Sequence, residues 1–498
     1  MLEVDLNLAG KKCFLIGIKG TGMSSLAVIL KKAGAFVTGC DSNEVFPTDQ
    51  LLEDAEICFA SGFGADLLME DADFLIYSDA YRRENCPVLA VALSRFFDRC
   101  HSYPQFLALL SSMCRTYGVA GTHGKTTTTA AAGWLLSQGK RKQFPLFAVM
   151  GSAVAGEGAI CNGTDEMLIE ACEYRDHFLS YDLRGVLITS IEMDHPDWFA
   201  DENAVCRSFE KLVKGLSKGG VVILCVDDPN VRKLSKWVEC NRKDLICVEY
   251  GFSSQSAFRI RRSGKAYSID LVPYVTFALN AMSDPIICDY FGAAILASSI
   301  LLDRSNPRLF LDDSALVCDE ILGTLVGSMM KEMELFPGVR SRNEVVAQEN
   351  GIVYIDDYAH HPTEIRVCLD NLRRSYPGRR LCVAFSPHTY SRTSALMEEF
   401  VAALAMANVV VVQKTYASAR GETADSDNAR ELAEKLSSRI SRSLYGCLES
   451  AVYIEYDEDA AAFLADALGQ NGVCISLGAG NNRPLLGRII ELRRGDGR

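Results

Sequence analysis

A glycine-rich stretch between an apolar run and a predicted helix is the part of this sequence best suited to binding phosphate. It reads Gly-Thr-His-Gly-Lys-Thr-Thr and follows the run 115–120. Glycines let backbone N–H groups approach a ligand, and a helix N-terminus favours negative charge. The stretch therefore predicts a nucleotide site, although Val119 replaces the first glycine of the strict phosphate-loop pattern. We expect Lys125 on the outer phosphates and the Thr126 hydroxyl on Mg²⁺. The expected nucleotide-binding residues are Gly121, Thr122, His123, Gly124, Lys125, Thr126 and Thr127.

Histidines and acids follow several predicted strands. The histidines at such places are His123, His195, His360, His361 and His388. Glu173 and His195 both belong to the segment that carries the phosphate loop, and we expect them beside Thr126 as Mg²⁺ ligands. The alternative is that Glu173 is a solvated loop acid and that His195 pairs with Asp194 or Asp197.

Arginines bring positive charge to the last third of the chain. Arg392 lies three residues after Thr389 and four after His388. A guanidinium there is suited to gripping a phosphate or a carboxylate. For Arg340 and Arg420, an exposed surface position explains the sequence as well as a ligand-binding role does.

The N-terminal segment predicts a βαβ unit. A strand over 12–18 leads into a glycine turn, a helix over 24–33 follows, and a second strand ends at Asp41. Such a turn can face phosphate, and the acid about 20 residues on can hold a ribose or a base edge. Lys19 stands where a second glycine is expected, so a purely structural turn explains this spacing as well.

Strands that end in polar residues recur along the chain, which is typical of open α/β sheets with sites along one edge. We expect an α/β fold in three segments, 1–110, 111–333 and 334–498. Within the third, apolar residues spaced i, i+3, i+4, i+7 from Ile365 predict a helix that starts at Pro362, and a further helix is expected over 394–407. The stretch 250–335 predicts only strands followed by a helix near 291–302.

Composition narrows the class of protein. A chain of 498 residues is expected to form several domains, and its net charge of −13 argues against a general nucleic-acid binder. Its 18 cysteines include no C-x-x-C pair, so they predict small buried side chains in a reducing cytoplasm rather than zinc ligands or disulfides. No basic signal-peptide start is present, and the apolar run 286–302 is interrupted by Asp289 and short for a membrane span.

Motifs in all three segments together resemble one family, the Mur ligases. They are Gly17-Ile-Lys-Gly-Thr-Gly-Met-Ser, Gly121-Thr-His-Gly-Lys-Thr-Thr-Thr, Glu170-Ala-Cys-Glu-Tyr, Ile191-Glu-Met-Asp-His-Pro-Asp, Asp356-Asp-Tyr-Ala-His-His-Pro-Thr-Glu-Ile, Pro387-His-Thr-Tyr-Ser-Arg-Thr and Gly478-Ala-Gly. The resemblance implies a Rossmann-like UDP-sugar domain, a central P-loop ATPase domain and a C-terminal Rossmann-like domain that closes over the site. It also implies a reaction in which the lactyl carboxylate of UDP-N-acetylmuramate is activated by ATP as an acyl phosphate and joined to L-alanine.

The resemblance assigns roles to residues in matching motifs. Catalytic roles fall to Lys125, His195, His388 and Arg392. Asp357 joins the phosphate loop in holding ATP, and Thr126, Glu173 and His195 hold Mg²⁺. Substrate contacts are implied for Gly17, Gly20, Thr21, Gly22, Met23, Asp41, Ser42, Tyr358, His360 and Arg392. No nucleic acid or membrane insertion is implied, and the sequence does not predict the oligomeric state.

Several positions depart from the family pattern. They are Ser190 for Asn, Ser386 for Gln, Ser341 for Arg ahead of the retained Arg342, Asn343 for Phe, and Asn481 for Asp. An expected His-Asn-x-x-Asn stretch is replaced by the residues 286–290. We therefore expect weak ATP binding and poor discrimination against GTP, with Tyr290 stacking on the base, or Asn280 contacting it, as compensation.

Three other functions remain open at this point. A ligase that recycles murein tripeptide onto the same sugar nucleotide would share the architecture and differ in the incoming amine. A partitioning-type P-loop ATPase would act as a switch, but its phosphate loop belongs at the very N-terminus. A binding protein that no longer turns over would explain the changed residues near 286.

Overall fold

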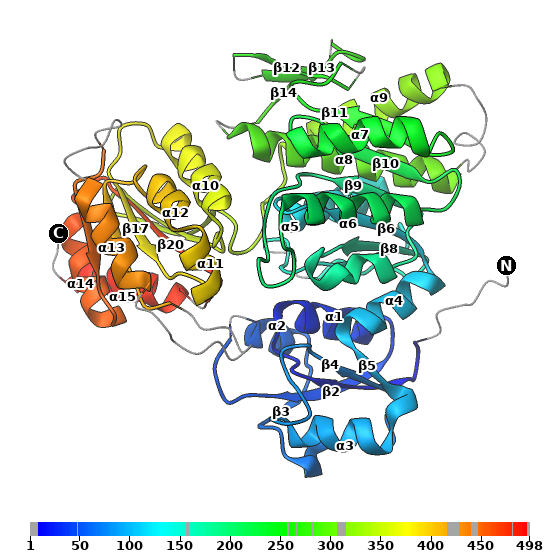
Figure 1. Cartoon of the computed structure of the whole chain (residues 1–498), viewed down its shortest axis with the longest axis horizontal. Helices are drawn as coiled ribbons and strands as arrows, with labels where there is room; N and C mark the ends of the chain where they lie inside the picture. Colours follow the sequence, from blue (N-terminus) through cyan, green and yellow to red (C-terminus); the bar gives the residue numbers. More distant parts are fainter. Residues whose placement is uncertain are drawn as a thin grey trace. The chain divides into compact units, whose positions relative to one another are not determined.

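The structure is a computed structural model that describes residues 8–46, 48–155, 159–255, 258–264, 266–273, 275–279, 282–305, 315–415, 428–439, 447–480 and 482–495. The chain forms two compact units, residues 1–279 with 285–338, and residues 280–284 with 339–498. Each is built from largely parallel sheets with helices against them (Figure 1). The α/β class predicted from the sequence is confirmed. The boundaries at 110 and 333 stay predictions.

The N-terminal sheet is parallel throughout, with the order β3-β2-β1-β4-β5. Its strands are β1 (Lys12–Ile16), β2 (Phe36–Asp41), β3 (Phe59–Ser61), β4 (Phe74–Tyr77) and β5 (Cys100–Ser102). Helices α1 (Thr21–Lys32) and α4 (Tyr103–Met113) share a hydrophobic core with one face of the sheet, and α3 (Pro87–Arg95) packs on the other. Short helix α2 (Asp49–Asp54) lies beside α1. The predicted βαβ unit is therefore present.

The central sheet of the same unit carries the phosphate loop, with the parallel order β11-β10-β9-β6-β8-β7. Its strands are β6 (Arg115–Ala120), β7 (Leu146–Val149), β8 (Glu166–Glu170), β9 (Gly185–Ile188), β10 (Val221–Cys225) and β11 (Ile246–Tyr250). Its helices are α5 (Lys125–Ser137), α6 (Glu202–Gly215) and α7 (Pro229–Asn241). All residues of β9 and β10 are buried, because helices cover both faces of such a sheet.

The stretch that was hardest to predict contains a small antiparallel sheet and two long helices. The strands are β12 (Ile260–Ser263), β13 (Ala266–Ile269) and β14 (Phe277–Ala278), and the helices are α8 (Asp284–Ser305) and α9 (Ala315–Met333). The predicted order of strands and then a helix is confirmed, but α8 is longer than expected and α9 was missed. Helix α8 is buried on nearly every side, so it lacks the polar stripe that marks a surface helix. It is apolar and long enough to cross a membrane, yet 78% of its most apolar window is buried inside the protein, as in a core helix.

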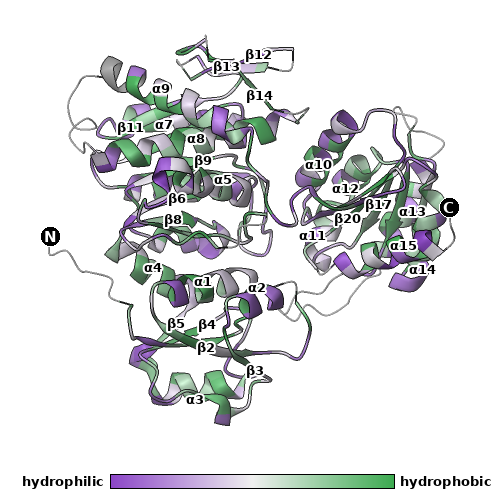
Figure 2. Ribbon diagram, turned by 180° about the vertical axis from the view of Figure 1, so that it is seen from behind, coloured by the Kyte–Doolittle hydropathy of each residue, from purple (hydrophilic) through white to green (hydrophobic). Residues whose placement is uncertain are grey.

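The C-terminal unit contains one mixed sheet, with the order β15-β16-β20-β17-β18-β19. Its strands are β15 (Glu344–Glu349), β16 (Ile352–Asp357), β17 (Leu381–Phe385), β18 (Val409–Val412), β19 (Ser450–Tyr453) and β20 (Val473–Leu477), of which only the edge strand β15 pairs antiparallel. Helices α10 (Pro362–Ser375), α12 (Met397–Leu404) and α13 (Asn428–Arg439) cover one face. Helices α14 (Asp457–Ala467) and α15 (Arg483–Gly495) cover the other. Figure 2 shows the apolar colouring concentrated on the strands and the polar colouring on the outer helix faces.

Two helix predictions in this unit had different outcomes. The four apolar residues predicted to form one face of α10, from Ile365 to Leu372, are all buried, so that prediction is confirmed. The single helix expected over 394–407 is instead α11 (Tyr390–Ala395) followed by α12. The break falls at Leu396, whose φ of −115° is not helical.

Removing Asp303 from α8 is expected to destabilise the first unit by about 3 kcal/mol, because it leaves the partly buried Arg184 guanidinium and the buried Tyr117 hydroxyl without their shared partner. The Asp303 carboxylate is 2% exposed, accepts a hydrogen bond of 2.5 Å from the Tyr117 hydroxyl and pairs with Arg184 at 3.0 Å. Urea-dependent hydrogen exchange in β6 peptides of Asp303→Ala measures the effect. The matched control is Asp270→Ala, which breaks an exposed pair with Arg261 and is expected to cost at most about 1 kcal/mol. Equal losses in both variants would contradict this account.

Candidate functional site

The phosphate loop has the geometry that the sequence predicts. It leaves β6, turns at Gly121 (φ +137°) and Gly124 (φ +79°), and enters α5 at Lys125. A Cβ at Gly121 would lie 2.1 Å from the Thr189 hydroxyl, so only glycine fits there. No side chain caps the N-terminus of α5. The first-turn N–H groups of the helix are thus left for an anion.

Two carboxylates from the end of β8 meet the loop. Lys125 Nζ lies 2.9 Å from Glu173 Oε2, and it also donates to the carbonyl oxygens of Gly121 (2.5 Å) and Thr122 (3.0 Å). Burial alone would lower the pKa of Lys125, but the charge and hydrogen bond of Glu173, together with the neighbouring Cys172 and Glu170, outweigh burial and raise the pKa. The Thr126 hydroxyl donates to Glu170 Oε1 at 2.9 Å. The loop thus presents one fixed cation and oxygen donors suited to a hard divalent ion.

Glu170 is a residue that the sequence analysis left without a role. It ends β8, and its second carboxylate oxygen accepts a hydrogen bond of 2.7 Å from the Gly151 N–H, which orients the side chain. Its place at a strand end, three residues before Glu173, was the signal that could have identified it.

His195 lies close to the predicted metal residues. Its Nε2 is 3.9 Å from Glu173 Oε1 and 3.7 Å from Asp194 Oδ2, and its ring lies 4.7 Å from that of Tyr174. Its φ is +53°, a left-handed conformation that is uncommon outside glycine. Both partners that the sequence suggested therefore occur in its surroundings, since Asp194 faces the histidine and Asp197 accepts from the Tyr174 hydroxyl. A magnesium role for His195 stays a prediction.

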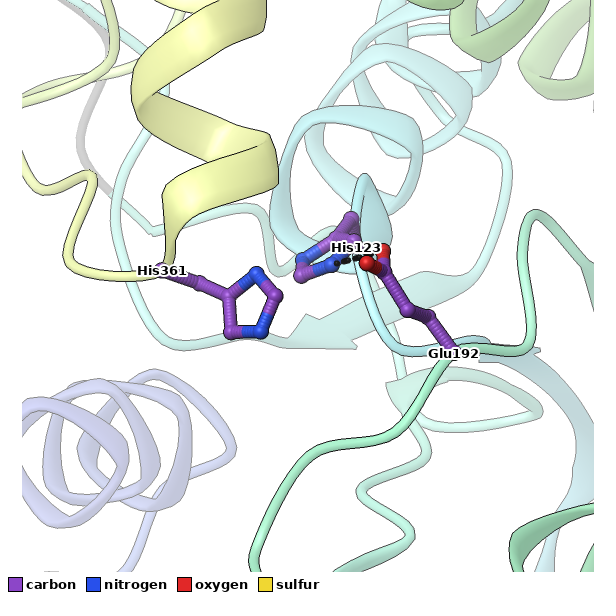
Figure 3. Close-up of side chains that lie close together, drawn as sticks. All are labelled: His123, Glu192 and His361. Carbon is purple, nitrogen blue, oxygen red and sulfur yellow. Dashed lines mark hydrogen bonds and ion pairs between the residues drawn. The ribbon is translucent and has the colours of Figure 1, made fainter. Parts of the chain in front are cut away.

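The loop after β9 braces the phosphate loop. Figure 3 shows the His123 ring turned toward Glu192, with Nε2 3.0 Å from the carboxylate. The Ser190 hydroxyl accepts the His123 N–H at 3.0 Å, and the Glu192 N–H donates to the Thr122 hydroxyl at 2.9 Å. The loop conformation is therefore held from outside by its neighbour. Figure 3 also draws His361, which begins α10 in the other unit.

The N-terminal turn is ordered from within by Asp41. This carboxylate is 2% exposed and accepts hydrogen bonds from the Lys19 N–H (2.7 Å), the Ser42 N–H (2.7 Å) and the Tyr81 hydroxyl (2.8 Å). The turn residues Gly20 and Thr21 at the start of α1 are exposed, whereas Met23 is buried. Gly17 (φ +82°) and Gly22 face tyrosine rings that leave no room for a Cβ. Ligand contacts of Asp41 and of this turn stay predictions.

The C-terminal unit gathers several of the predicted residues in one chain of contacts. The His360 and His388 rings lie 5.3 Å apart, and His388 Nδ1 is 3.3 Å from Arg392 Nη1. The Tyr358 ring lies 5.3 Å from that of His360, and the Arg342 guanidinium is 5.2 Å from the Tyr358 ring centre. Arg392 is only 6% exposed, and the preceding Thr389 has φ +66°, which is strained for a β-branched residue. Such buried positive charge suits a phosphate or carboxylate ligand.

Asp357 at the end of β16 is a buried carboxyl with an unusual pKa. It is 4% exposed and accepts the N–H groups of Asn343 and Ala359, each at 2.7 Å. Burial raises its pKa from 3.8 to about 6, against the opposing effects of Arg342 and the two N–H donors.

Asp357→Asn is expected to change how stability depends on pH. The folded-state pKa is raised, so the stability that this group contributes is fully present below pH 3.8 and is lost as the pH rises through about 6. That difference in pKa corresponds to about 3 kcal/mol. As the pH rises from 3.8 to about 6, the free energy of unfolding of the variant should therefore increase by about 3 kcal/mol relative to that of the parent. Urea-dependent hydrogen exchange in β16 and β20 peptides measures it, and a pH-independent difference between the two proteins would contradict it.

Comparison with known proteins identifies the family. The family models described as "Mur ligase family, catalytic domain", "Mur ligase middle domain" and "Mur ligase, glutamate ligase domain" match residues 14–113, 119–281 and 341–480. A UDP-N-acetylmuramate–L-alanine ligase of Treponema pallidum is 33% identical over 96% of this chain and 95% of its own length. The chain belongs to the Mur ligase family. A Desulfitobacterium hafniense ligase of the same name is 34% identical, covering 94% of this chain and 96% of its own.

Solved Mur ligase structures share the fold. UDP-N-acetylmuramate–alanine ligase of Thermotoga maritima matches with a TM-score of 0.71 and 21% identity, over 97% of this chain and 99% of its own. A murein peptide ligase of Psychrobacter arcticus matches with a TM-score of 0.65 and 19% identity, over 97% and 98%. These likenesses establish the three-domain Mur ligase fold for this chain.

The departures from the Mur ligase pattern near residue 341 have local partners. The Ser341 hydroxyl donates to Asp356 at 2.7 Å, and the Arg483 guanidinium pairs with the same carboxylate at 3.0 Å and with Glu344. Asn343 donates its N–H to Asp357. Arg483 was not singled out in the sequence, because it lies 127 residues from Asp356 and belongs to no recognised motif.

The prediction that Tyr290 compensates for the missing His-Asn-x-x-Asn stretch is wrong. Tyr290 was expected to stack on the nucleotide base, but it is 8% exposed and its ring packs edge-on against Phe336, with centres 5.6 Å apart. The adjacent Asp289 faces the phosphate loop instead, since a Cβ on Gly124 would lie 2.4 Å from its carboxylate. Successive residues of a helix point about 100° apart, so the neighbouring side chains of Asp289 and Tyr290 meet different surroundings. Asn280, the other candidate, lies outside the described residues, as does Asn481.

Proposed function

We propose that this protein is an ATP-dependent ligase that joins L-alanine to the lactyl carboxylate of UDP-N-acetylmuramate, in the synthesis of peptidoglycan precursors. The observation that carries the proposal is the similarity, over nearly the full length, to ligases of that name. The phosphate loop, with Lys125 and two carboxylates beside it, provides the site for ATP that such a reaction needs.

The proposed reaction has two steps. A lactyl carboxylate oxygen forms a bond to the γ-phosphorus of ATP while the bond to ADP breaks, which gives an acyl phosphate. The L-alanine nitrogen then attacks the acyl carbon and loses a proton, and the C–O bond to phosphate breaks to leave an amide. Both reactants of the first step are anions, so the site must neutralise charge. We assign this role to Lys125.

The donor set of the loop fits Mg²⁺. The Thr126 hydroxyl and the Glu170 and Glu173 carboxylates supply hard oxygen ligands, and the first two are already within hydrogen-bonding distance of each other. When bound, the ion would neutralise phosphate charge and hold it in place. We add Glu170 to the predicted set of Thr126, Glu173 and His195.

We propose the remaining roles from the same similarity to the Mur ligases. We assign the exposed turn at the start of α1 to the sugar nucleotide, Asp357 to the nucleotide, and Tyr358, His360, His388 and Arg392 to the reacting substrates. The segments 1–110, 111–333 and 334–498 would be the corresponding domains. A cytoplasmic location suits the nucleotide substrates and the cysteines, which are all free in the described part of the chain.

A tripeptide-recycling ligase is the nearest alternative. The match to a murein peptide ligase is 19% identical and supports the fold only, whereas the L-alanine ligases are 30–34% identical. The sequence similarity therefore favours the free amino acid as the incoming amine.

Phosphate release from ATP, measured with UDP-N-acetylmuramate and a panel of amines, tests the proposed function. We expect release with L-alanine, weaker release with glycine or L-serine, and a product whose mass equals that of the sugar nucleotide plus one alanine less water. Release with the murein tripeptide but not with L-alanine would overturn the proposed substrate. Phosphate release that does not depend on the sugar nucleotide would overturn the proposal that the protein is a ligase.

Glu170→Gln, Glu173→Gln and His195→Ala are each expected to raise the Mg²⁺ concentration for half-maximal activity by about tenfold or more, since each loses a ligand or its orienting neighbour. The measurement is a Mg²⁺ titration at saturating ATP. Glu239→Gln, an exposed change on α7, is the control and should leave the titration unchanged. A normal titration in all three variants would remove these residues from the metal site.

A further inference from the structure

Two cysteines far apart in the sequence meet beside a carboxylate in the first unit. Cys225 ends β10, Asp227 follows it in the turn before α7, and Cys288 lies in the first turns of α8. Their sulfur and carboxylate atoms all lie within 4.8 Å of one another. Both cysteines are 5% exposed, whereas Asp227 is partly exposed and gives a route from solvent.

The distances suit a tetrahedral metal. Cys288 Sγ lies 3.4 Å from Asp227 Oδ2. A zinc ion with a sulfur at about 2.3 Å and an oxygen at about 2.0 Å would hold those two atoms about 3.5 Å apart. The cluster thus needs little rearrangement to close around such an ion.

The Asp227 carboxylate is held in place by the chain around it. It accepts the N–H groups of Phe252 (2.9 Å) and Ser253 (2.6 Å). The chain approaches it through Gly251, where φ is +134° and a Cβ would lie 2.9 Å from the carboxylate carbon. Such outer hydrogen bonds orient the carboxylates that bind metals.

A buried hydroxyl completes the cluster. Tyr250, the last residue of β11, is fully buried; its hydroxyl lies beside the Cys225 thiol and has no oxygen or nitrogen hydrogen-bond partner among the described residues. Burial raises the pKa of the Tyr250 hydroxyl most. The neighbouring Cys225, Cys288 and Asp289 raise it further. A buried hydroxyl with only a weak thiol partner costs free energy, and a cation among these groups would offset that cost.

We propose that Cys225, Asp227 and Cys288 form a binding site for a thiophilic divalent cation such as Zn²⁺, with the Tyr250 hydroxyl facing the ion. Two thiolates select soft ions, so the site discriminates against the Mg²⁺ that accompanies ATP. No C-x-x-C spacing marks it, because its ligands come from a strand, a turn and a helix that meet only in the folded chain.

Cobalt titration of the full-length protein, reduced with a phosphine and treated with chelator, tests the proposal. We expect one Co²⁺ per chain with a thiolate charge-transfer band, which one equivalent of Zn²⁺ displaces and excess Mg²⁺ does not. Cys225→Ala and Cys288→Ala should each lose the band and bind Zn²⁺ at least about 100-fold more weakly. Cys247→Ala, which removes a partly buried cysteine from β11, is the matched control and should behave as the parent.

X-ray absorption of the zinc-loaded parent protein gives a second readout that requires no variant. Two sulfur ligands at about 2.3 Å support the site. A shell with fewer than two sulfurs would overturn it, as would a cobalt band that persists in Cys288→Ala or is missing from the parent.

Discussion

Lys125→Ala is expected to abolish ligation while the protein stays folded. In the described structure, Lys125 is held at the phosphate loop by hydrogen bonds to two loop carbonyls and by an ion pair with Glu173. Its charge would offset the charge of the transferring phosphoryl group. Groups in that role are worth about 10³-fold or more in kcat. Initial rates of phosphate release at saturating substrates measure the loss.

The control for this variant is Lys214→Ala, which removes an exposed lysine from α6. It should retain the parent rate. Lys214→Ala should unfold at the parent temperature, whereas Lys125→Ala should unfold cooperatively at a lower temperature, because it leaves the buried Glu173 carboxylate without its cation. A folded Lys125→Ala protein with full activity would end the assignment of the phosphate loop.

Arg392→Ala is expected to lower kcat/KM by about 10²–10³-fold, because a buried guanidinium that contacts a reacting anion contributes mainly to the transition state. Arg392→Lys should recover little of that loss. Lysine keeps the charge but lacks the planar donor pair that grips a phosphate or carboxylate. The kinetics of both variants, measured against each substrate in turn, show which substrate the arginine contacts.

Arg374→Lys provides the comparison for Arg392→Lys. Arg374 lies on α10 of the same unit and pairs with Asp370 in an exposed position. Its substitution should leave kcat/KM unchanged. Equal activities of Arg392→Lys and the parent would return Arg392 to a structural role beside His388.

Much of this fold could be predicted because the signals are local. The phosphate loop lies between β6 and α5 as expected, and the apolar face of α10 is buried at every predicted position. Strands buried on both faces are continuous apolar runs, which are easy to locate. The edge strand β15 was missed because its residues alternate between partly buried and exposed, without a continuous apolar run.

Contacts between distant segments were harder to predict. The sequence led us to expect Glu173 beside Thr126, whereas Glu173 pairs with Lys125 and the Thr126 hydroxyl donates to Glu170. The stacking role expected of Tyr290 failed because the direction of a residue on a buried helix depends on what packs against it, here Phe336. The meeting of Cys225 with Cys288 also depends on tertiary structure alone.

In the proposed reaction, the carboxylate of the sugar nucleotide takes the γ-phosphoryl group of ATP. UDP-N-acetylmuramate labelled with ¹⁸O in both lactyl carboxylate oxygens tests this directly. If the carboxylate attacks phosphorus and L-alanine then displaces phosphate, each phosphate released in the presence of L-alanine carries one ¹⁸O atom, and the amide product retains the other. Unlabelled phosphate would mean that water attacks ATP, and it would contradict the account.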